Sequence, residues 1–306
     1  MYNEKLKTTY IKENEHINLN LETVMTKLFD ELEPVEVELN KDASNFTIFE
    51  ILSFYKSLCT ASLERLLVMN SQMSKYTSYC LNNSLVKDNQ NHYEEIDNEV
   101  LLQCVNLAKA KDQIISREEL LKEIYQLPNP SDQFLILGLF EGISGQKNSD
   151  FFDLNMRNFN GNKVILPTRE LIVSDKLVSL AEESVNEYTY YAYKANGDFR
   201  ELNYSSTDIN IIKQMYNAKE DTEAVKRQRI YNKLIRVKKY LGRECYTRSA
   251  LLESGRIEMI KGLMTNNSVE NLDETIRKYQ DDIAYRYGRI YSIPRYILKY
   301  KDYFVN

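Results

Sequence analysis

The 306-residue chain has a globular composition, with 43% hydrophobic and 28% charged residues. This composition excludes disorder over most of the length, and the chain is long enough for two modest domains that hold a core without disulfides or metal. No run of 18 apolar residues occurs and the N-terminus is polar, which predicts a cytoplasmic protein without a membrane span. The four cysteines are scattered and form no CxxC pair, so we expect reduced thiols, most of them in the core.

The charge is distributed unevenly along the chain. The net charge is -5, yet residues 226–306 carry 18 Lys and Arg against 9 Asp and Glu, which leaves a net charge of -14 for residues 1–225. A basic last quarter can present one positive surface to phosphates, while the acidic remainder keeps the protein in solution.

Residues 1–45 form an acidic N-terminal arm in this interpretation. The segment DELEPVEVELNKD contains Pro34 and alternating apolar residues, which favours an extended arm or a short edge strand. Its carboxylates, among them Glu31 and Glu38, are interpreted as a solvated surface, with contact to a basic partner as the alternative.

Residues 46–112 are predicted to form a first domain of four helices. FTIFEILSFYKSLC has helical spacing after Asn45 or Thr47 as the N-cap, and ASLERLLVMNSQMSKYTSYCLNN and EVLLQCVNLAKA continue in the same period. The remaining residues, 113–306, are assigned to a second domain.

The second domain begins with helices and continues into strands. Ser116 and Glu119 have the spacing of a capping box, and SDQFLILGLFEGISGQ predicts a buried helix. NGNKVILPTRELIVS predicts a β-hairpin, and the tyrosine-rich EYTYYAYKANGDFRELNYS predicts a further extended pair with an Asn196-Gly197 turn. The fold is therefore expected to be mainly α with a small antiparallel β-sheet.

The helix predicted in VKRQRIYNKLIRVKKYLG has an apolar and a basic face. The buried stripe consists of Ile230, Leu234, Val237 and Leu241, and the other face of Lys226, Arg229, Lys233, Arg236 and Tyr240. Such a face is usually just solvated. Residues 226–261 hold 11 basic residues against 3 acidic ones, however, which favours contact with phosphates.

Three stretches resemble motifs of the tyrosine recombinase, or phage integrase, family. SGQKNSDFFDL resembles the family's TGxRxSExxxL, with Lys147 at the first catalytic arginine. The family carries a catalytic lysine near the hairpin turn, where Arg169 is the nearest basic residue, and YTRSALLESGRIEMI resembles TxHxLRHTxA, with Ser249 and Leu252 at the catalytic histidine and arginine. The resemblance spans residues 46–306. It implies a SAM-like helical core-binding domain over residues 46–112 and a catalytically degenerate recombinase-like domain over residues 113–306.

The resemblance implies that strand cleavage has been lost. The family's reaction needs two arginines on the phosphate, proton transfer by His and Lys, and a tyrosine nucleophile. Lysine lacks the bidentate fork of arginine, and both histidines, His16 and His92, precede the second domain. Arg289 stands near the family's last catalytic histidine. Tyr296 and Tyr300 are the tyrosines nearest the nucleophile position, and we interpret them as packing residues, with a nucleophilic role as the alternative. No catalytic residue, cofactor or metal site is predicted.

The chain also resembles the integrase-like master repressors of SPβ-group phages. That resemblance implies a sequence-specific protein that binds double-stranded DNA, represses lytic genes and maintains lysogeny, in the cytoplasm of a bacterial host and on its nucleoid. A protein or peptide regulator would be a further partner. The predicted DNA contacts are Lys147, Arg169, Lys233, Arg236, Lys238, Lys239 and Arg248. The alternatives are an active recombinase with an atypical site and a protein-interaction module. The segment ending KDYFVN is expected to pack either in its own chain or in a neighbouring one.

Overall fold

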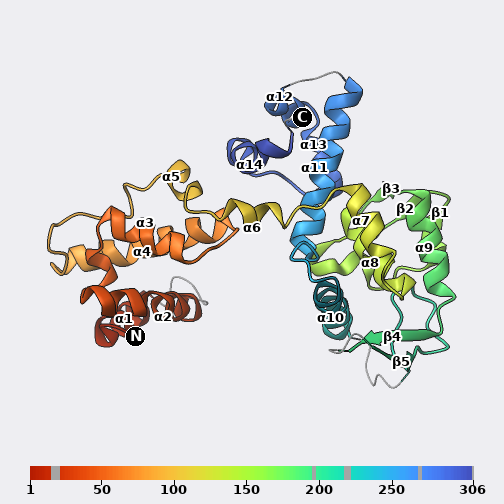
Figure 1. Ribbon diagram of the computed structural model, residues 1–306, viewed down its shortest axis with the longest axis horizontal. Coiled ribbons are helices and arrows are strands. Elements are labelled where there is room, and N and C mark those ends of the chain that lie inside the picture. The colour runs from red at the N-terminus through yellow and green to blue at the C-terminus, as the bar shows by residue number, and fades with distance from the viewer. Residues whose placement is uncertain (15–20, 195–197, 217–221, 268–270, 305–306) are drawn as a thin grey trace. The chain divides into compact units, whose positions relative to one another are not determined.

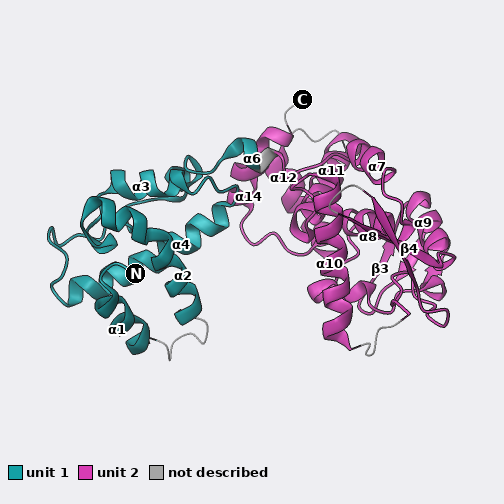
Figure 2. Ribbon diagram, turned by 60° about the horizontal axis from the view of Figure 1, so that its bottom comes forward, with its two compact units in different colours: residues 1–111 teal, residues 112–306 magenta. Residues whose placement is uncertain are grey.

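The computed structural model describes residues 1–14, 21–194, 198–216, 222–267 and 271–304. The chain divides into two compact units, Met1–Lys111 and Asp112–Asn306 (Figure 2). Both are mostly helical, and the second also contains two small antiparallel sheets, which confirms the predicted fold class. No helix in the described ranges is long and apolar enough to cross a membrane.

The first unit is built from helices around one core. They are α1 (Glu4–Asn14), α2 (Leu21–Leu39), the 3-10 turn η2 (Ala43–Asn45), α3 (Ile48–Ser57), α4 (Leu63–Asn82), α5 (Asn98–Leu102) and α6 (Leu107–Lys111) (Figure 1). Thr47 caps α3 in a capping box, because its hydroxyl accepts from the N–H of Glu50 while the Glu50 carboxylate accepts from the N–H of Thr47. The helices predicted between residues 46 and 112 are confirmed.

The prediction of an extended arm or edge strand before residue 45 is wrong. Helix α2 continues through Pro34 and buries residues at helical spacing in the core of the first unit, namely Met25, Leu28, Phe29 and Leu32. Glu36 extends this buried side and forms a salt bridge with Lys7 of α1, where both side chains are fully buried. Packing of this face outweighs the backbone hydrogen bond that proline removes, and local alternation around Pro34 concealed the helical period.

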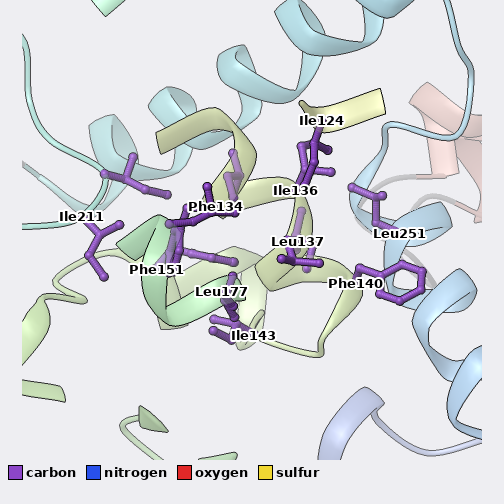
Figure 3. Packing of buried hydrophobic residues seen from close by; sticks show 14 of the residues in the cluster. Ile124, Phe134, Ile136, Leu137, Phe140, Ile143, Phe151, Leu177, Ile211 and Leu251 are labelled. Atoms are coloured by element: carbon purple, nitrogen blue, oxygen red, sulfur yellow. The ribbon is translucent and has the colours of Figure 1, made fainter. Parts of the chain in front are cut away.

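The second unit surrounds helix α8. Its helices are α7 (Arg117–Ile124), α8 (Pro130–Phe140), α9 (Asp175–Val185), α10 (Glu223–Leu241), α11 (Arg248–Asn267), α12 (Leu272–Lys278), α13 (Gln280–Tyr287) and α14 (Ile293–Tyr300), with 3-10 turns η3 (Gln146–Phe151), η4 (Met156–Asn158) and η5 (Lys301–Tyr303). Figure 3 shows Leu137 and Phe140 of α8 in the core with Leu251 of α11. A Cβ at Gly255 of α11 would lie 1.8 Å from the carbonyl oxygen of Phe140, so only glycine permits this close approach to α8.

Two antiparallel sheets lie in the second unit. One has the order β1 (Phe159–Asn160), β2 (Lys163–Ile165), β3 (Glu170–Ile172), and the other pairs β4 (Thr189–Tyr193) with β5 (Phe199–Asn203). The N–H of Leu166 donates to the carbonyl of Arg169 at 2.8 Å, which closes the predicted β2–β3 hairpin. The second extended pair is confirmed by pairing such as Tyr193 with Phe199, and its predicted Asn196-Gly197 turn lies outside the described residues.

The last four helices enclose a separate core. Ile257 and Ile260 of α11 pack there with Ile283 of α13 and with the tyrosines of α14, and Phe304 packs against the same cluster. The described part of the C-terminal segment, which ends at Phe304, therefore packs against this core.

Candidate nucleic-acid interface

The loop that follows α8, residues 142–150, carries the first predicted contact and is called the Lys147 loop here. Gly142 and Gly145 have φ of 94° and 60°, and the adjacent Lys147 and Asn148 have φ of 54° and 67°. Each left-handed non-glycine residue costs on the order of 1–3 kcal/mol and persists only where the surroundings hold it. The Lys147 side chain is exposed, whereas Asn148 is buried.

The buried carboxylate of Asp150 holds the Lys147 loop. Its Oδ2 accepts from the N–H of Ser144 at 3.2 Å, and the Asp150 N–H donates to the carbonyl of Ser144 at 3.3 Å. A Cβ at Gly145 would lie 2.4 Å from Asp150 Oδ1. The loop therefore needs glycine at that position for space as well as for φ.

Arg169 reaches the loop from the β2–β3 hairpin. Its Nη2 donates to Asp150 Oδ2 and to the carbonyl of Gly142, both at 2.9 Å. The side chain is 17% exposed, and its Nε is buried without a hydrogen-bond partner within the described ranges. The hairpin thus fixes a guanidinium beside the loop and leaves part of its donor capacity unused.

Arg248 reaches the same loop from the first residue of α11. Its Nε donates to Asn148 Oδ1 at 2.8 Å and its Nη2 to the carbonyl of Gly145 at 3.0 Å. Burial lowers the pKa of Arg248, while Asp150 acts in the opposite direction. A guanidinium stays protonated in proteins, so the site keeps this charge.

Three segments far apart in the sequence thus place Lys147, Arg169 and Arg248 around one loop, with Asp150 as the carboxylate that orients it. Three cations against one anion give a local positive charge. Guanidinium groups match the oxygen geometry of phosphate, and lysine adds a point charge. The arrangement can bind a phosphate.

Lys233 was predicted as a DNA contact, and the structure contradicts that role. Its Nζ lies 2.6 Å from Asp132 Oδ1 and 3.1 Å from Ser131 Oγ, and only 2% of its side chain is exposed. A buried, paired ammonium cannot reach a phosphate of a duplex. Of the regularly spaced basic residues on α10, Lys233 therefore stabilises the fold instead of facing solvent. Its acidic partner is about a hundred positions away in sequence.

The other predicted contacts on α10 are at the surface. Arg236 and Lys239 are exposed, and Lys238 is half-buried beside Glu244, with 2.6 Å between its Nζ and a carboxylate oxygen. A surface ion pair of this kind contributes about 0–1 kcal/mol, so Lys238 can exchange Glu244 for another anion at little cost.

Tyr296 and Tyr300, the tyrosines nearest the family's nucleophile position, are packed in the last core. They are 6% and 9% exposed, and their ring centroids lie 4.9 Å apart. Burial, together with nearby Glu253, raises the pKa of Tyr296 well above the ordinary value.

Sequence reasoning missed the parts that Asn148, Asp150 and Asp132 play. Asp150 stands at the acidic position of the SGQKNSDFFDL motif, but its contact with Arg169 depends on the tertiary fold. Asn tolerates the left-handed region better than most residues, which is the one local signal that marked Asn148.

Two family models match this chain. Residues 114–306 match the family model described as MrpR, C-terminal catalytic domain. The chain belongs to the MrpR family. Residues 1–82 match the MrpR N-terminal core-binding domain, which includes the helices α1 and α2 that had been interpreted as an arm.

One relative of this MrpR-family chain is the SPbeta prophage-derived uncharacterized protein YopR of Bacillus subtilis (strain 168). It is 25% identical over 315 residues, which cover 97% of this chain and 94% of the relative. Together the two family models show a core-binding domain and a catalytic domain of tyrosine-recombinase-like architecture.

Proposed function

We propose that this protein is a sequence-specific binder of double-stranded DNA that represses lytic phage genes on an integrase scaffold without strand cleavage. The observation that carries the proposal is the convergence of Lys147, Arg169 and Arg248 on one loop, where the family resemblance puts the DNA phosphate. Contacts to phosphates position a protein on the duplex and make its affinity depend on salt.

The proposed contact set follows from burial. Five further cations that are at least partly exposed join Lys147, the most exposed cation of the loop. Lys233 is left out because it is buried against Asp132. The set is Lys147, Arg169, Arg236, Lys238, Lys239 and Arg248. Its phosphate contacts supply affinity, whereas base contacts would supply the specificity.

Two features support binding without cleavage. The position of the first catalytic arginine holds Lys147, which offers no bidentate fork to a pentavalent phosphate, and no histidine occurs after His92. The nearest tyrosine hydroxyls are buried in the core of α11–α14. Loss of several groups that act as a unit lowers a cleavage rate by orders of magnitude.

A prophage-derived relative of nearly the same length favours a role in phage gene control. The test is a gel-shift screen of fragments from the phage or prophage genome with excess non-specific competitor, followed by a reporter under the promoter next to each bound fragment. We expect few bound fragments and a silenced reporter. Binding without silencing would overturn the repressor role, and a covalent protein–DNA adduct would favour the recombinase alternative.

The Lys147 loop is tested by Lys147→Ala beside Lys122→Ala, an exposed lysine of α7 outside the contact set. We expect Lys147→Ala to weaken binding to all sequences alike and to reduce the salt slope by about 1. Equal affinities of the two variants would remove the loop from the interface.

A further inference from the structure

Four aromatic rings form a continuous surface cluster where the β4–β5 hairpin meets α10. The Tyr193 ring lies 6.0 Å from that of Phe199 and 4.7 Å from that of Tyr240, and Tyr191 lies 6.5 Å from Phe199, all between centroids. Tyr191, Phe199 and Tyr240 are 37%, 39% and 38% exposed. Figure 1 shows β4 and β5 beside α10.

Hydrogen bonds to Asn129 and Asp132 hold this cluster on helix α8. The side-chain amide of Asn129 accepts from the N–H of Tyr191 at 2.7 Å and donates to its carbonyl at 3.0 Å. The Tyr190 and Tyr193 hydroxyls donate to Asp132 Oδ2 at 3.1 and 2.9 Å. These bonds fix the backbone of Tyr191 and the ring of Tyr193 on α8, so part of the cluster is ordered before any partner arrives, which lowers the entropy cost of binding.

The segments that carry the rings have an excess of exposed positive charge. On the β4–β5 hairpin with its ends and on residues 232–241 of α10, the exposed cations are Lys194, Arg200, Arg236 and Lys239, against the exposed acids Asp198 and Glu201. A second copy of the same surface would be repelled by this excess. The complementary partner is a polyanion that also offers planar faces.

We propose that this aromatic–basic surface, formed by the four rings and the four cations, binds single-stranded nucleic acid by stacking unpaired bases on Tyr191, Phe199 and Tyr240. Rings on a hairpin with flanking Lys and Arg are the elements by which proteins hold unpaired bases and their phosphates. A duplex hides the faces of its bases, so these rings add nothing to duplex binding. Arg236 and Lys239 are shared with the proposed duplex contacts, whereas the rings are not.

The test measures binding of the full-length protein to fluorescein-labelled (dT)15 and, separately, to a duplex of the same length, by anisotropy at low salt. The variant Tyr191→Leu/Phe199→Leu keeps apolar bulk and removes the stacking faces. Tyr231→Leu is the matched control, because Tyr231 is an exposed tyrosine of α10 outside the ring cluster. Stacking on one ring changes affinity by about tenfold or more.

We expect the double variant to bind (dT)15 at least about tenfold more weakly than the wild type, with the control unchanged and duplex binding equal in all three. Absence of (dT)15 binding by the wild type overturns the proposal and leaves the surface to a protein partner. Equal (dT)15 affinity of the double variant and the wild type also overturns it. Duplex binding is read separately, so it tests the proposed function independently.

A second measurement needs no variant and therefore does not depend on the folding of the double variant. The wild type is photocrosslinked to a (dT)15 analogue that contains iodouracil, and the crosslinked peptide is mapped by mass spectrometry. Crosslinks at Tyr191, Phe199 or Tyr240 are expected. Crosslinks confined to other segments overturn the proposal.

Discussion

Replacing Lys233 by methionine is expected to destabilise the second unit without changing the DNA affinity of the folded protein. Burial lowers the pKa of Lys233, but Asp132, Tyr190 and Glu187 together outweigh burial and raise that pKa, so Lys233 stays protonated at neutral pH. Removing the cation leaves Asp132 buried without its counter-charge, which costs about 3–5 kcal/mol. Asp132 keeps the hydrogen bonds from Tyr190 and Tyr193, so we expect the lower end, about 3 kcal/mol.

For a unit of this size, about 3 kcal/mol lowers the melting temperature by roughly 6–12 °C. Thermal and urea unfolding followed by circular dichroism measure the loss, and Lys239→Met is the matched control because its side chain is exposed. We expect the control to stay within about 0.5 kcal/mol of the wild type and to bind DNA more weakly. A Lys233→Met variant that melts with the wild type and loses DNA binding would refute this reasoning.

Adding Asp132→Asn to Lys233→Met gives a second check, because the neutral amide removes the uncompensated charge. The double variant is expected to regain part of the lost stability. A double variant less stable than the sum of both single losses would show that the charge pair is not the source of the effect.

Two further perturbations test the site and its surroundings. Burial raises the pKa of Glu187 to about 7, so its ionised form is disfavoured in the folded state, and stability should fall by roughly 3 kcal/mol as pH rises from about 4.5 to about 7. Melting curves recorded across this pH range should show that Glu187→Gln does not lose this stability. The same dependence of the melting temperature on pH in the variant and the wild type would contradict this prediction. Gly145→Ala should abolish tight duplex binding, because the added Cβ meets Asp150. The control is Gly161→Ala, where φ is 57° and no atom lies within 4 Å of the added Cβ. This control should cost only backbone strain and should retain binding in the same gel-shift assay. Equal binding by both glycine variants would show that the loop geometry is not required.

The elements that the sequence predicts well are those whose period is not interrupted. Ile230, Leu234 and Val237 of α10 recur regularly and are buried as expected, and the β2–β3 hairpin follows from its turn residues. Helix α2 was missed because Pro34 and the surrounding alternation favour extended structure locally, while packing against α1 and α4 favours the helix.

The candidate site was predictable only in part. Local motifs and the family resemblance located Lys147, Arg169 and Arg248, which the fold brings to one loop. Lys233 has the same period and charge as the surface cations, and only the tertiary position of Asp132 distinguishes it. Hydrogen bonds such as those of Asp150 join segments that lie far apart in the sequence, so the sequence alone does not reveal them.

The salt dependence of binding to a selected duplex tests the central claim most directly. Six phosphate contacts predict that the logarithm of the binding constant falls against the logarithm of salt concentration with a slope of about -5, and a denaturing gel of the same mixture should show no covalent adduct. A slope near zero, absence of binding at low salt, or a covalent tyrosine–DNA adduct would contradict the account.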